Sequence, residues 1–351
     1  MKILFFINQL YDGGAERVAS NMLNHFCENH EVYVAVIHFK SPFYPIDNRI
    51  HIIDNRAKSI IKGTTRIPRF VKMIQTIRNI HPNIIISFIT KTNNNALLAN
   101  FFCKKKIIIS ERGTLTHELE QRHRILRKIL YPRANKIVFV TQSDNIKFGI
   151  PHKSITIYNP SSFNIYKDHN NRQKTIVSVA ANNRWHIKGI DLLIKAWIKI
   201  APQNPNWNLE IYGRIYEGGK TNERCPISHD RAKWMGWKDD MSEVFRSKSI
   251  FAITSRNEAC PNSLIEAMSQ GCTCIGTDCD GGIKEIITDG VDGLIAKNEN
   301  VDDIAEKLQT LINDENLRRR LSAGAIEKAK QFDKNTFFAK WDKLIEEVAG
   351  K

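Results

Sequence analysis

Long apolar runs are absent from this 351-residue chain. No stretch of 18 apolar residues occurs, so we expect no membrane-spanning helix. The first apolar run, Ile3–Ile7, is only five residues long and meets Asn8 and Gln9, and no small-residue cleavage site follows it. A buried first strand explains this run better than a signal peptide does. We therefore expect a cytoplasmic protein.

Cysteine is also scarce, and its seven copies suggest neither disulfides nor a metal site. An odd number of cysteines in a chain of this length argues against a disulfide framework. The pair Cys272 and Cys274 lacks the two-residue spacing and the distant partner pair of a zinc site, and the 11 histidines form no ligand pattern. We expect reduced thiols, no metal and no cofactor.

Acidic residues are few in the first half of the chain. Residues 1–160 hold 24 lysines and arginines against 10 aspartates and glutamates, whereas the remainder holds 28 against 27. This asymmetry predicts an anionic partner: nucleic acid, an anionic membrane surface or a phosphorylated acceptor. Nucleic acid is disfavoured, because the sequence has no recognisable helix-turn-helix, zinc or RNA-binding signature and its basic runs are not interleaved with aromatic residues.

Short, continuous apolar runs alternate with helical patterns along the whole chain. Such runs are typical of parallel strands covered on both faces, and the alternation predicts an α/β fold with doubly wound parallel sheets. The predicted strands are Ile3–Ile7, Glu31–Ile37, Asn83–Ile89, Lys106–Ser110, Lys136–Thr141, Thr175–Ala180, Trp207–Tyr212, Ile250–Thr254 and Thr273–Gly276.

The predicted strands fall into two sets, separated by the polar, turn-rich residues 161–174. We interpret residues 1–160 and 175–334 as two Rossmann-like domains and residues 161–174 as their linker. In such sheets ligands bind at the carboxyl ends of the strands, so two domains facing each other would form a central cleft. A helical apolar stripe in residues 335–351 predicts a last helix that packs back on the first domain.

The loop after Ile250–Thr254 is the most informative segment. A helix is predicted from Ser263 to Gln270, ended by Gly271, and its amino-terminal amides would suit a diphosphate. Glu266 lies about one turn into this helix, where a carboxylate can accept hydrogen bonds from a ribose diol. Glu258 lies eight residues earlier in the loop. By themselves, two glutamates at this spacing are better explained as two solvated charges.

The context of the two glutamates supports a functional interpretation. The run S-R-N-E-A-C-P-N-S-L-I-E-A-M-S-Q-G, followed by T-D-C-D-G-G-I-K-E-I-I and D-G-V-D-G-L-I, resembles the retaining glycosyltransferases of family 4, which have the GT-B fold. The resemblance implies that Glu266 holds the ribose hydroxyls and that Glu258 lies near the donor sugar. It also implies that the backbone around Pro261, Asn262, Ser263 and Leu264 holds the β-phosphate. Ala259 and Cys260 depart from the family pattern, and packing explains Cys260 better than a nucleophilic role.

A second motif farther upstream, K-G-I-D-L-L-I-K-A-W, also resembles this family. The resemblance implies that Lys188 neutralises the departing diphosphate. Arg184 is the nearest cation to the family's second basic position, although the segment is about two residues longer than usual. Two fixed cations would supply the charge that other enzymes take from a divalent metal, so we expect metal-independent activity.

The string G-G-A-E-R after the first strand resembles the same family. Gly13 and Gly14 would let the backbone approach the donor closely, and Glu16 and Arg17 would face the acceptor. A tight turn alone would also explain the two glycines. In a later loop, S-E-R-G, we assign Glu111 as a base that orients the acceptor and Arg112 as a contact to the acceptor or its phosphate.

Two segments of the first half combine basic and apolar residues at helical spacing. They are Ile60–Ile80 and Leu119–Lys136. Packing on a sheet explains the apolar stripes, but it does not explain the excess of positive charge. We therefore favour peripheral association with an anionic membrane over a merely basic surface.

The combined expectation is a retaining transferase that moves a sugar from a nucleotide-sugar, by family habit a UDP-sugar, to a glycan or polyprenyl-diphosphate-linked oligosaccharide. The acceptor hydroxyl would attack on the face that the nucleotide leaves. Two alternatives are a nucleotide-sugar epimerase or phosphorylase on the same architecture, which the G-G-A-E-R loop and the two glutamates disfavour, and a basic nucleic-acid-binding protein.

Overall fold

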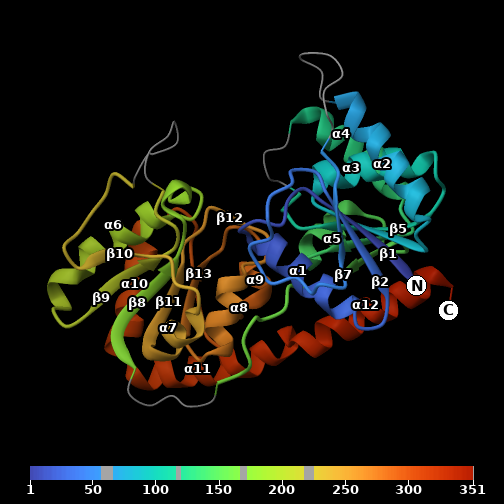
Figure 1. The fold of residues 1–351 in the computed structure, drawn as a ribbon. Coiled ribbons are helices and arrows are strands. Elements are labelled where there is room, and N and C mark those ends of the chain that lie inside the picture. The colour runs from blue at the N-terminus through green and yellow to red at the C-terminus, as the bar shows by residue number, and fades with distance from the viewer. Residues whose placement is uncertain (57–65, 116–119, 167–171, 217–224, 351) are drawn as a thin grey trace. The chain divides into compact units, whose positions relative to one another are not determined.

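The computed structural model describes residues 1–56, 66–115, 120–166, 172–216 and 225–350, with the side chains of residues 66–70 excepted (Figure 1). The chain forms two compact units. Unit 1 consists of Met1–Asn159 with Asn335–Lys351, and unit 2 is Pro160–Lys334. The predicted linker is part of unit 2: Ser161 N donates to Phe332 O at 2.7 Å, and the first strand of unit 2 already begins at Gln173.

Unit 1 is built on a seven-stranded sheet in the order β3-β2-β1-β4-β5-β6-β7, and every pairing in it is parallel. Its strands are β1 (Lys2–Ile7), β2 (Glu31–Val36), β3 (His51–Asp54), β4 (Ile84–Phe88), β5 (Lys106–Glu111), β6 (Lys136–Phe139) and β7 (Ser154–Thr156). Its helices are α1 (Gly14–Phe26), α2 (Arg66–Ile80), α3 (Thr90–Phe101), α4 (Gln121–Leu130), α5 (Gln142–Phe148) and α12 (Lys334–Ala349), with a 3₁₀ turn η1 (Tyr131–Arg133).

The continuous apolar character of the strands follows from burial on both faces of the sheet. In β1, Ile3, Phe5 and Ile7 belong to one core cluster, whereas Leu4 and Phe6 belong to another, as the two-residue period of a strand requires. The final helix α12 completes the first cluster, because its fully buried Trp341 packs there.

Unit 2 repeats this plan with a six-stranded sheet in the order β10-β9-β8-β11-β13-β15, again parallel throughout. Its strands are β8 (Gln173–Val179), β9 (Asn208–Tyr212), β10 (Ala232–Gly236), β11 (Lys248–Ile253), β13 (Thr273–Thr277) and β15 (Leu294–Ala296), with a separate pair β12 (Asn257–Glu258) and β14 (Asp280–Gly281). Its helices are α6 (Ile190–Ile200), α7 (Met241–Ser247), α8 (Asn262–Ser269), α9 (Ile283–Ile286), α10 (Val301–Asn313) and α11 (Glu315–Ala329), with 3₁₀ turns η2 (Asn182–Arg184), η3 (Ala201–Gln203) and η4 (Lys330–Phe332).

The strand order of each sheet reverses at one point. In unit 1 the order runs outward in both directions from β1 and β4, and in unit 2 from β8 and β11. Open parallel sheets bind ligands outside the carboxyl ends of the strands at such a switch point. The loops that follow these four strands are therefore where the functional groups of each unit should gather.

All nine predicted strands are confirmed, each within about two residues of its expected ends. The sequence pattern does not predict the short strands β3, β7, β10 and β15, because their three to five residues are too few or too exposed to give a continuous apolar run. The same holds for the two-residue strands β12 and β14. Among the described residues, no helix has the length and apolarity needed to cross a bilayer.

Candidate active site

Lys188 and Glu258 form an ion pair at the switch point of unit 2. Lys188 follows β8 and Glu258 follows β11, and these strands are neighbours in the sheet. Lys188 Nζ contacts Glu258 Oε2, and Ser255 Oγ lies 3.4 Å from the same oxygen. The two charged side chains keep 18% and 16% of their surface exposed, so both are partly desolvated but still accessible to a ligand. The sequence predicted both residues as functional, and the fold brings them together from 70 positions apart.

The backbone around Lys188 depends on Gly189. This glycine is in the left-handed region (φ 62°), and a Cβ there would lie 1.8 Å from the carbonyl oxygen of Thr254. Thr254 Oγ1 in turn donates to Gly189 O at 2.8 Å. Only glycine permits this close approach of the Lys188 loop to the end of β11.

Glu258 is held by main-chain pairing. The strands β12 and β14 match Glu258 with Gly281, and Gly282 N donates to Glu258 O at 3.0 Å. This contact gives a structural role to the pair Gly281 and Gly282. The carboxylate of Glu258 is thereby fixed beside the ammonium group of Lys188.

Helix α8 presents its amino terminus just after Glu258. Pro261 is the N-cap residue, and the amides of Leu264 and Ile265 both donate to Pro261 O, at 3.2 and 3.3 Å. Amides at the start of a helix point along its dipole and suit an anion. The Leu264 side chain is fully buried, so only its amide could reach a donor phosphate, and that contact stays a prediction. Asn262 and Ser263 keep that assignment as a prediction.

Glu266 lies one turn into α8 and is 3% exposed. Its main-chain oxygen accepts from Ser269 Oγ at 2.7 Å and from Gln270 N at 3.1 Å. The predicted helix end is confirmed, since Gly271 adopts φ 74° after the last turn. Cys260, between the two glutamates, is buried, which agrees with packing rather than nucleophilic chemistry.

Arg184 lies in η2 with its side chain exposed to solvent. Its carbonyl oxygen accepts a hydrogen bond from the Lys188 amide at 3.0 Å. Its main chain therefore supports the Lys188 loop, and its role as a second phosphate-binding cation stays a prediction.

In unit 1, the G-G-A-E-R loop follows β1 at the switch point, but Glu16 does not point outward. It is buried, and its Oε2 lies where a Cβ on Gly13 would be 2.1 Å away. Gln9 Nε2 approaches Glu16 Oε1 at 3.5 Å. We therefore correct the assignment of Glu16: its carboxylate shapes the loop over Gly13 instead of contacting an acceptor. Gly14 is exposed and Arg17 is half-buried, so both remain candidates.

Glu111, the predicted base, is also corrected by the structure. It is 1% exposed at the end of β5, and its Oε2 accepts from Thr90 Oγ1 at 2.7 Å and from the hydroxyl of Tyr131 at 2.6 Å. Burial, followed by the charge of Glu111, raises the pKa of Tyr131 well above its ordinary value, so Tyr131 remains a donor. With 1% of its surface exposed and one oxygen held by these two donors, the Glu111 carboxylate is not placed to orient an acceptor.

Arg112 is anchored in a similar way. Its Nη1 donates to Asn159 Oδ1 at 2.6 Å, and its guanidinium group lies 5.0 Å from the ring centre of Phe88. The side chain is half-buried, so one face of the guanidinium group is committed to packing. An acceptor contact by Arg112 stays a prediction.

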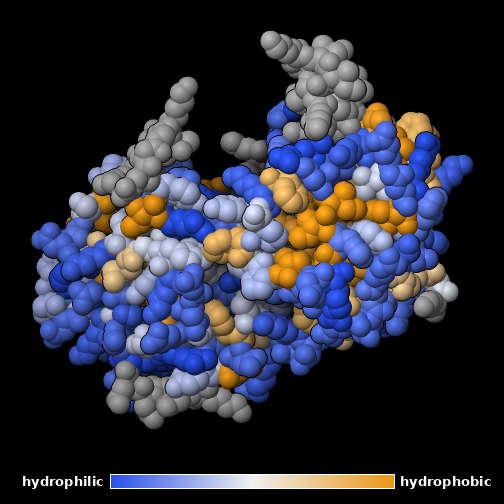
Figure 2. Space-filling model, viewed as in Figure 1, coloured by the Kyte–Doolittle hydropathy of each residue, from blue (hydrophilic) through white to orange (hydrophobic). Residues whose placement is uncertain are grey.

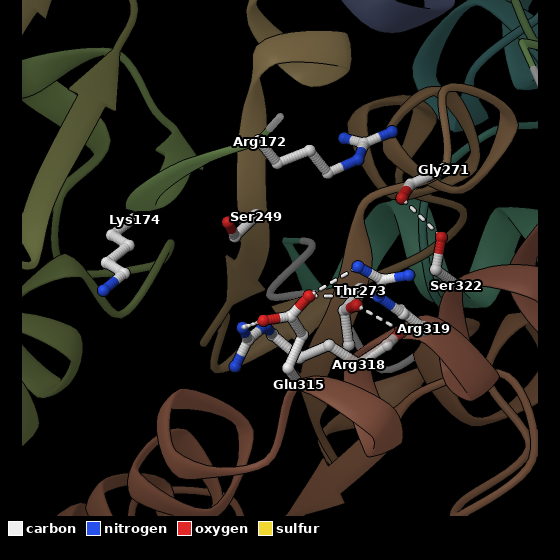
Figure 3. A pocket seen from close by; sticks show the side chains of 9 residues that line it. All are labelled: Arg172, Lys174, Ser249, Gly271, Thr273, Glu315, Arg318, Arg319 and Ser322. Atoms are coloured by element: carbon white, nitrogen blue, oxygen red, sulfur yellow. Dashed lines mark hydrogen bonds and ion pairs between the residues drawn. The ribbon is translucent and has the colours of Figure 1, made fainter. Parts of the chain in front are cut away.

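A cavity of about 210 Å³ in unit 2 is not part of this site (Figure 3). It lies at the opposite edge of the sheet, where β8, β11 and β13 begin. Its arginines stabilise the fold through internal hydrogen bonds. Arg172 donates to the carbonyls of Phe245, Lys248 and Gln270. Arg318 donates to the carbonyls of Leu311 and Ile312, and Arg319 donates to the carboxylate of Glu315.

Comparison with known proteins shows which protein family this part of the chain resembles. The model of the family "Glycosyl transferases group 1" matches residues 163–328, which include Lys188, Glu258 and Glu266. Residues 163–328 therefore resemble a group 1 glycosyltransferase domain. This domain lies within unit 2, so the half of the chain with the ion pair and the α8 terminus is the part that the family model describes.

Relatives cover the whole length of this glycosyltransferase. It is 25% identical over 356 residues to the Campylobacter jejuni GalNAc-alpha-(1->4)-GalNAc-alpha-(1->3)-diNAcBac-PP-undecaprenol alpha-1,4-N-acetyl-D-galactosaminyltransferase, with 99% of each chain covered. It is 26% identical over 361 residues to the amylovoran biosynthesis glycosyltransferase AmsD of Erwinia amylovora, covering 98% of this chain and 99% of that one. Bacterial glycan-assembly glycosyltransferases are thus its relatives.

Solved structures agree on the fold. The complex of Anabaena HepE with UDP superimposes with a TM-score of 0.81 at 18% identity, covering 99% of this chain and 100% of that one. The apo lipopolysaccharide outer core galactosyltransferase WaaB gives a TM-score of 0.73 at 20% identity over 98% and 99% of the two chains. With its two parallel-sheet units, the glycosyltransferase has the GT-B fold, as the sequence predicted.

Proposed function

We propose that this glycosyltransferase transfers a sugar, with retention of configuration and without a metal, from a UDP-sugar to a polyprenyl-diphosphate-linked oligosaccharide. The observation that carries the proposal is the meeting of Lys188, Glu258 and the α8 terminus at the switch point of unit 2. UDP and UDP-glucose are bound by HepE, whose fold is similar, and undecaprenyl-linked acceptors appear in the names of the Campylobacter relatives.

The proposed chemistry assigns each group a separate task. The helix terminus and Lys188 would bind the diphosphate and stabilise the charge that it gains as the bond between the anomeric carbon and phosphate oxygen breaks. The acceptor hydroxyl would form the new bond on the same face and pass its proton to the departing phosphate oxygen. Glu266 would accept hydrogen bonds from the ribose hydroxyls, and Glu258 would hold the donor sugar.

The experiment is calorimetric titration of UDP and a panel of UDP-sugars in the presence of EDTA. We expect one UDP-sugar to bind to the wild type, and Glu266→Ala to weaken that binding about tenfold or more, because a hydrogen bond to a charged group contributes about 1.5–3 kcal/mol. Glu243→Ala, on the exposed face of α7, is the matched control and should bind as the wild type does.

Transfer to an undecaprenyl-diphosphate-linked acceptor, followed by NMR of the product, tests the rest of the proposal. An α-linked product from an α-linked donor is expected. Failure of every UDP compound to bind would contradict the donor assignment, an inverted product would contradict retention, and activity that required Mg²⁺ or Mn²⁺ would contradict metal independence.

We also propose that the enzyme works on an anionic membrane surface through α4 and the end of α3. In α4, Ile125 and Ile129 are 50% and 54% exposed, and the exposed Arg122, Arg124 and Lys128 surround them. On the face that Figure 2 shows, the hydrophobic residues of unit 1 gather mainly below these helices, around the positions of α1 and α5 in Figure 1, so the case for α4 and α3 depends on the exposure of the residues named here.

The end of α3 offers a second group of exposed apolar residues in unit 1. Phe101 and Phe102 are 64% and 56% exposed and are followed by Lys104, Lys105 and Lys106. Helix α3 packs beside α4, since Asn94 Nδ2 donates to His123 O at 3.2 Å. Exposed aromatic and aliphatic side chains among lysines and arginines suit the boundary between lipid headgroups and acyl chains.

Other parts of the two basic segments do not support membrane contact. Arg127 is buried and donates to Leu115 O at 3.0 Å, and Lys136 pairs with Glu347 at 2.8 Å. In α2, Met73 and Ile77 are buried in the core, and only Val71, Gln75, Arg78 and Asn79 are exposed among the side chains described there. Residues 60–65 and the side chains of 66–70 lie outside the described residues.

A further inference from the structure

Arg256 lies two residues before Glu258, and its guanidinium group is almost fully engaged. Nη1 and Nη2 each donate to one carboxylate oxygen of Asp191, both at 2.8 Å, in the two-pronged geometry that only arginine provides. Nη1 also donates to His186 O, and Nε donates to Glu299 Oε1 at 2.9 Å. In addition, the Arg256 amide donates to Ile187 O at 2.9 Å.

These contacts fall on both sides of Lys188. Arg256 holds the carbonyls of His186 and Ile187 before it and the carboxylate of Asp191 after it. Thr254 fastens the intervening Gly189. Residues 186–191 are therefore hydrogen-bonded to the loop that carries Glu258. The same set of contacts positions both Lys188 and Glu258.

The Asp191 contact is the buried one. The side chains of Arg256 and Asp191 are 18% and 8% exposed, whereas Glu299 is 62% exposed. Burial by itself raises the pKa of Asp191, but the hydrogen bonds from Arg256 outweigh it and leave the pKa below its ordinary value. Removing one partner of a buried pair is costly, whereas an exposed pair contributes little.

We propose that Arg256 and Asp191 are positioning residues for the transfer reaction, holding the Lys188 loop in the geometry in which its ammonium group meets the donor diphosphate. The proposal rests on the proposed function of Lys188. Neither Arg256 nor Asp191 needs to touch the substrate. A cation on a flexible stem is useful in catalysis only where its main chain is fixed, and a misplacement of about 1 Å can cost roughly a hundredfold in rate.

The first test does not depend on activity. Amide hydrogen exchange is measured in the wild type, Arg256→Ala and the control Glu299→Ala. The amides of Lys188, Gly189 and Ile190 donate within the segment, to Arg184 O, His186 O and Trp185 O. We expect faster exchange at these amides in Arg256→Ala and no change in Glu299→Ala. Unchanged exchange in Arg256→Ala would overturn the proposal even if no substrate had been identified.

The second test is a double-mutant cycle on transfer activity. We expect Arg256→Ala to lower kcat/KM about a hundredfold. If Arg256 acts only through Lys188, the double variant Lys188→Ala/Arg256→Ala should be no slower than Lys188→Ala alone. Multiplied losses in the double variant would overturn the proposal, as would a loss in Arg256→Ala that only matched a smaller folded fraction in thermal melting. An inactive wild type would count against the proposed function instead, and the exchange result would still decide this proposal.

Discussion

At the scale of single residues, the role of a charged side chain depends on what surrounds it. Lys188 and Glu258 were predicted from motifs and do meet at the switch point of unit 2. Glu111 and Arg127 are also an acidic and a basic residue, but both are buried and hydrogen-bonded within unit 1. The sequence shows the charge of each residue, but only the fold shows which partner satisfies it.

Glu111→Gln tests the corrected role of that residue. Glu111 accepts hydrogen bonds from Thr90 and Tyr131 on a single oxygen, and a neutral glutamine would accept them more weakly while its NH2 group faced the Gly113 amide, which lies 3.4 Å from the other oxygen. We expect a loss of about 1–3 kcal/mol in the free energy of unfolding, measured in urea, with normal activity per folded molecule. Glu120→Gln, an exposed carboxylate, is the control. Unchanged stability with strongly reduced activity would restore the catalytic role.

At the scale of elements, loop backbone geometry determines where the site residues lie. Gly189 ends the Lys188 loop and begins α6 in the left-handed region, in contact with the end of β11. The sequence showed the glycine within the K-G-I-D motif, but its contact with Thr254 joins two loops 65 residues apart, which local pattern cannot reveal.

Two glycine substitutions separate the cost of the left-handed backbone at Gly189 from the cost of a clash with Thr254. Gly149, at the end of α5, has a similar φ of 75°, and a Cβ there would meet nothing within 4 Å. We expect Gly149→Ala to cost about 1–2 kcal/mol of stability from the left-handed backbone alone. Gly189→Ala adds a clash with Thr254 O and should cost clearly more and weaken UDP-sugar binding. Equal melting temperatures for the two variants would contradict the close contact.

Helix α12 is the clearest case of an element that belongs with residues far away in the sequence. It packs on unit 1, where Trp341 is fully buried and Asp342 contacts His25 Nε2 at 3.0 Å. Trp341→Ala should cost about 3–5 kcal/mol, measured by urea unfolding. Lys340→Ala, on an exposed position of the same helix, is the control. A loss below about 1 kcal/mol would mean that α12 contributes little to the core of unit 1.

At the scale of the whole molecule, the net positive charge lies almost entirely in the first half of the chain. Residues 1–160 hold 24 basic and 10 acidic residues. The net positive charge attracts anionic surfaces over a long range, and salt screens this attraction. The described surface adds a local feature that the composition does not contain, the exposed Phe101, Phe102 and Ile129 beside these charges.

Vesicle sedimentation tests the membrane proposal. We expect binding to vesicles containing phosphatidylserine at about 0.1 M salt and release near 1 M, where the screening length falls from about 10 to about 3 Å. Ile129→Ser and Phe101→Ser should weaken binding, whereas Ile198→Ser, an exposed isoleucine on α6 of unit 2, should not. Equal binding to neutral vesicles, or no effect of the two unit 1 substitutions, would contradict the proposal.

The sequence by itself determined the fold class, the nine longest buried strands and the motif residues of the donor half, because strand periodicity, helix caps and the spacing of Lys188, Glu258 and Glu266 are local properties. The tertiary structure decided what depends on contacts distant in sequence. These features are the burial of Glu16, Glu111 and Arg127, the short edge strands, and the ion pair between Arg256 and Asp191. Burial and partnership are set by residues up to hundreds of positions away, so no window of sequence contains them.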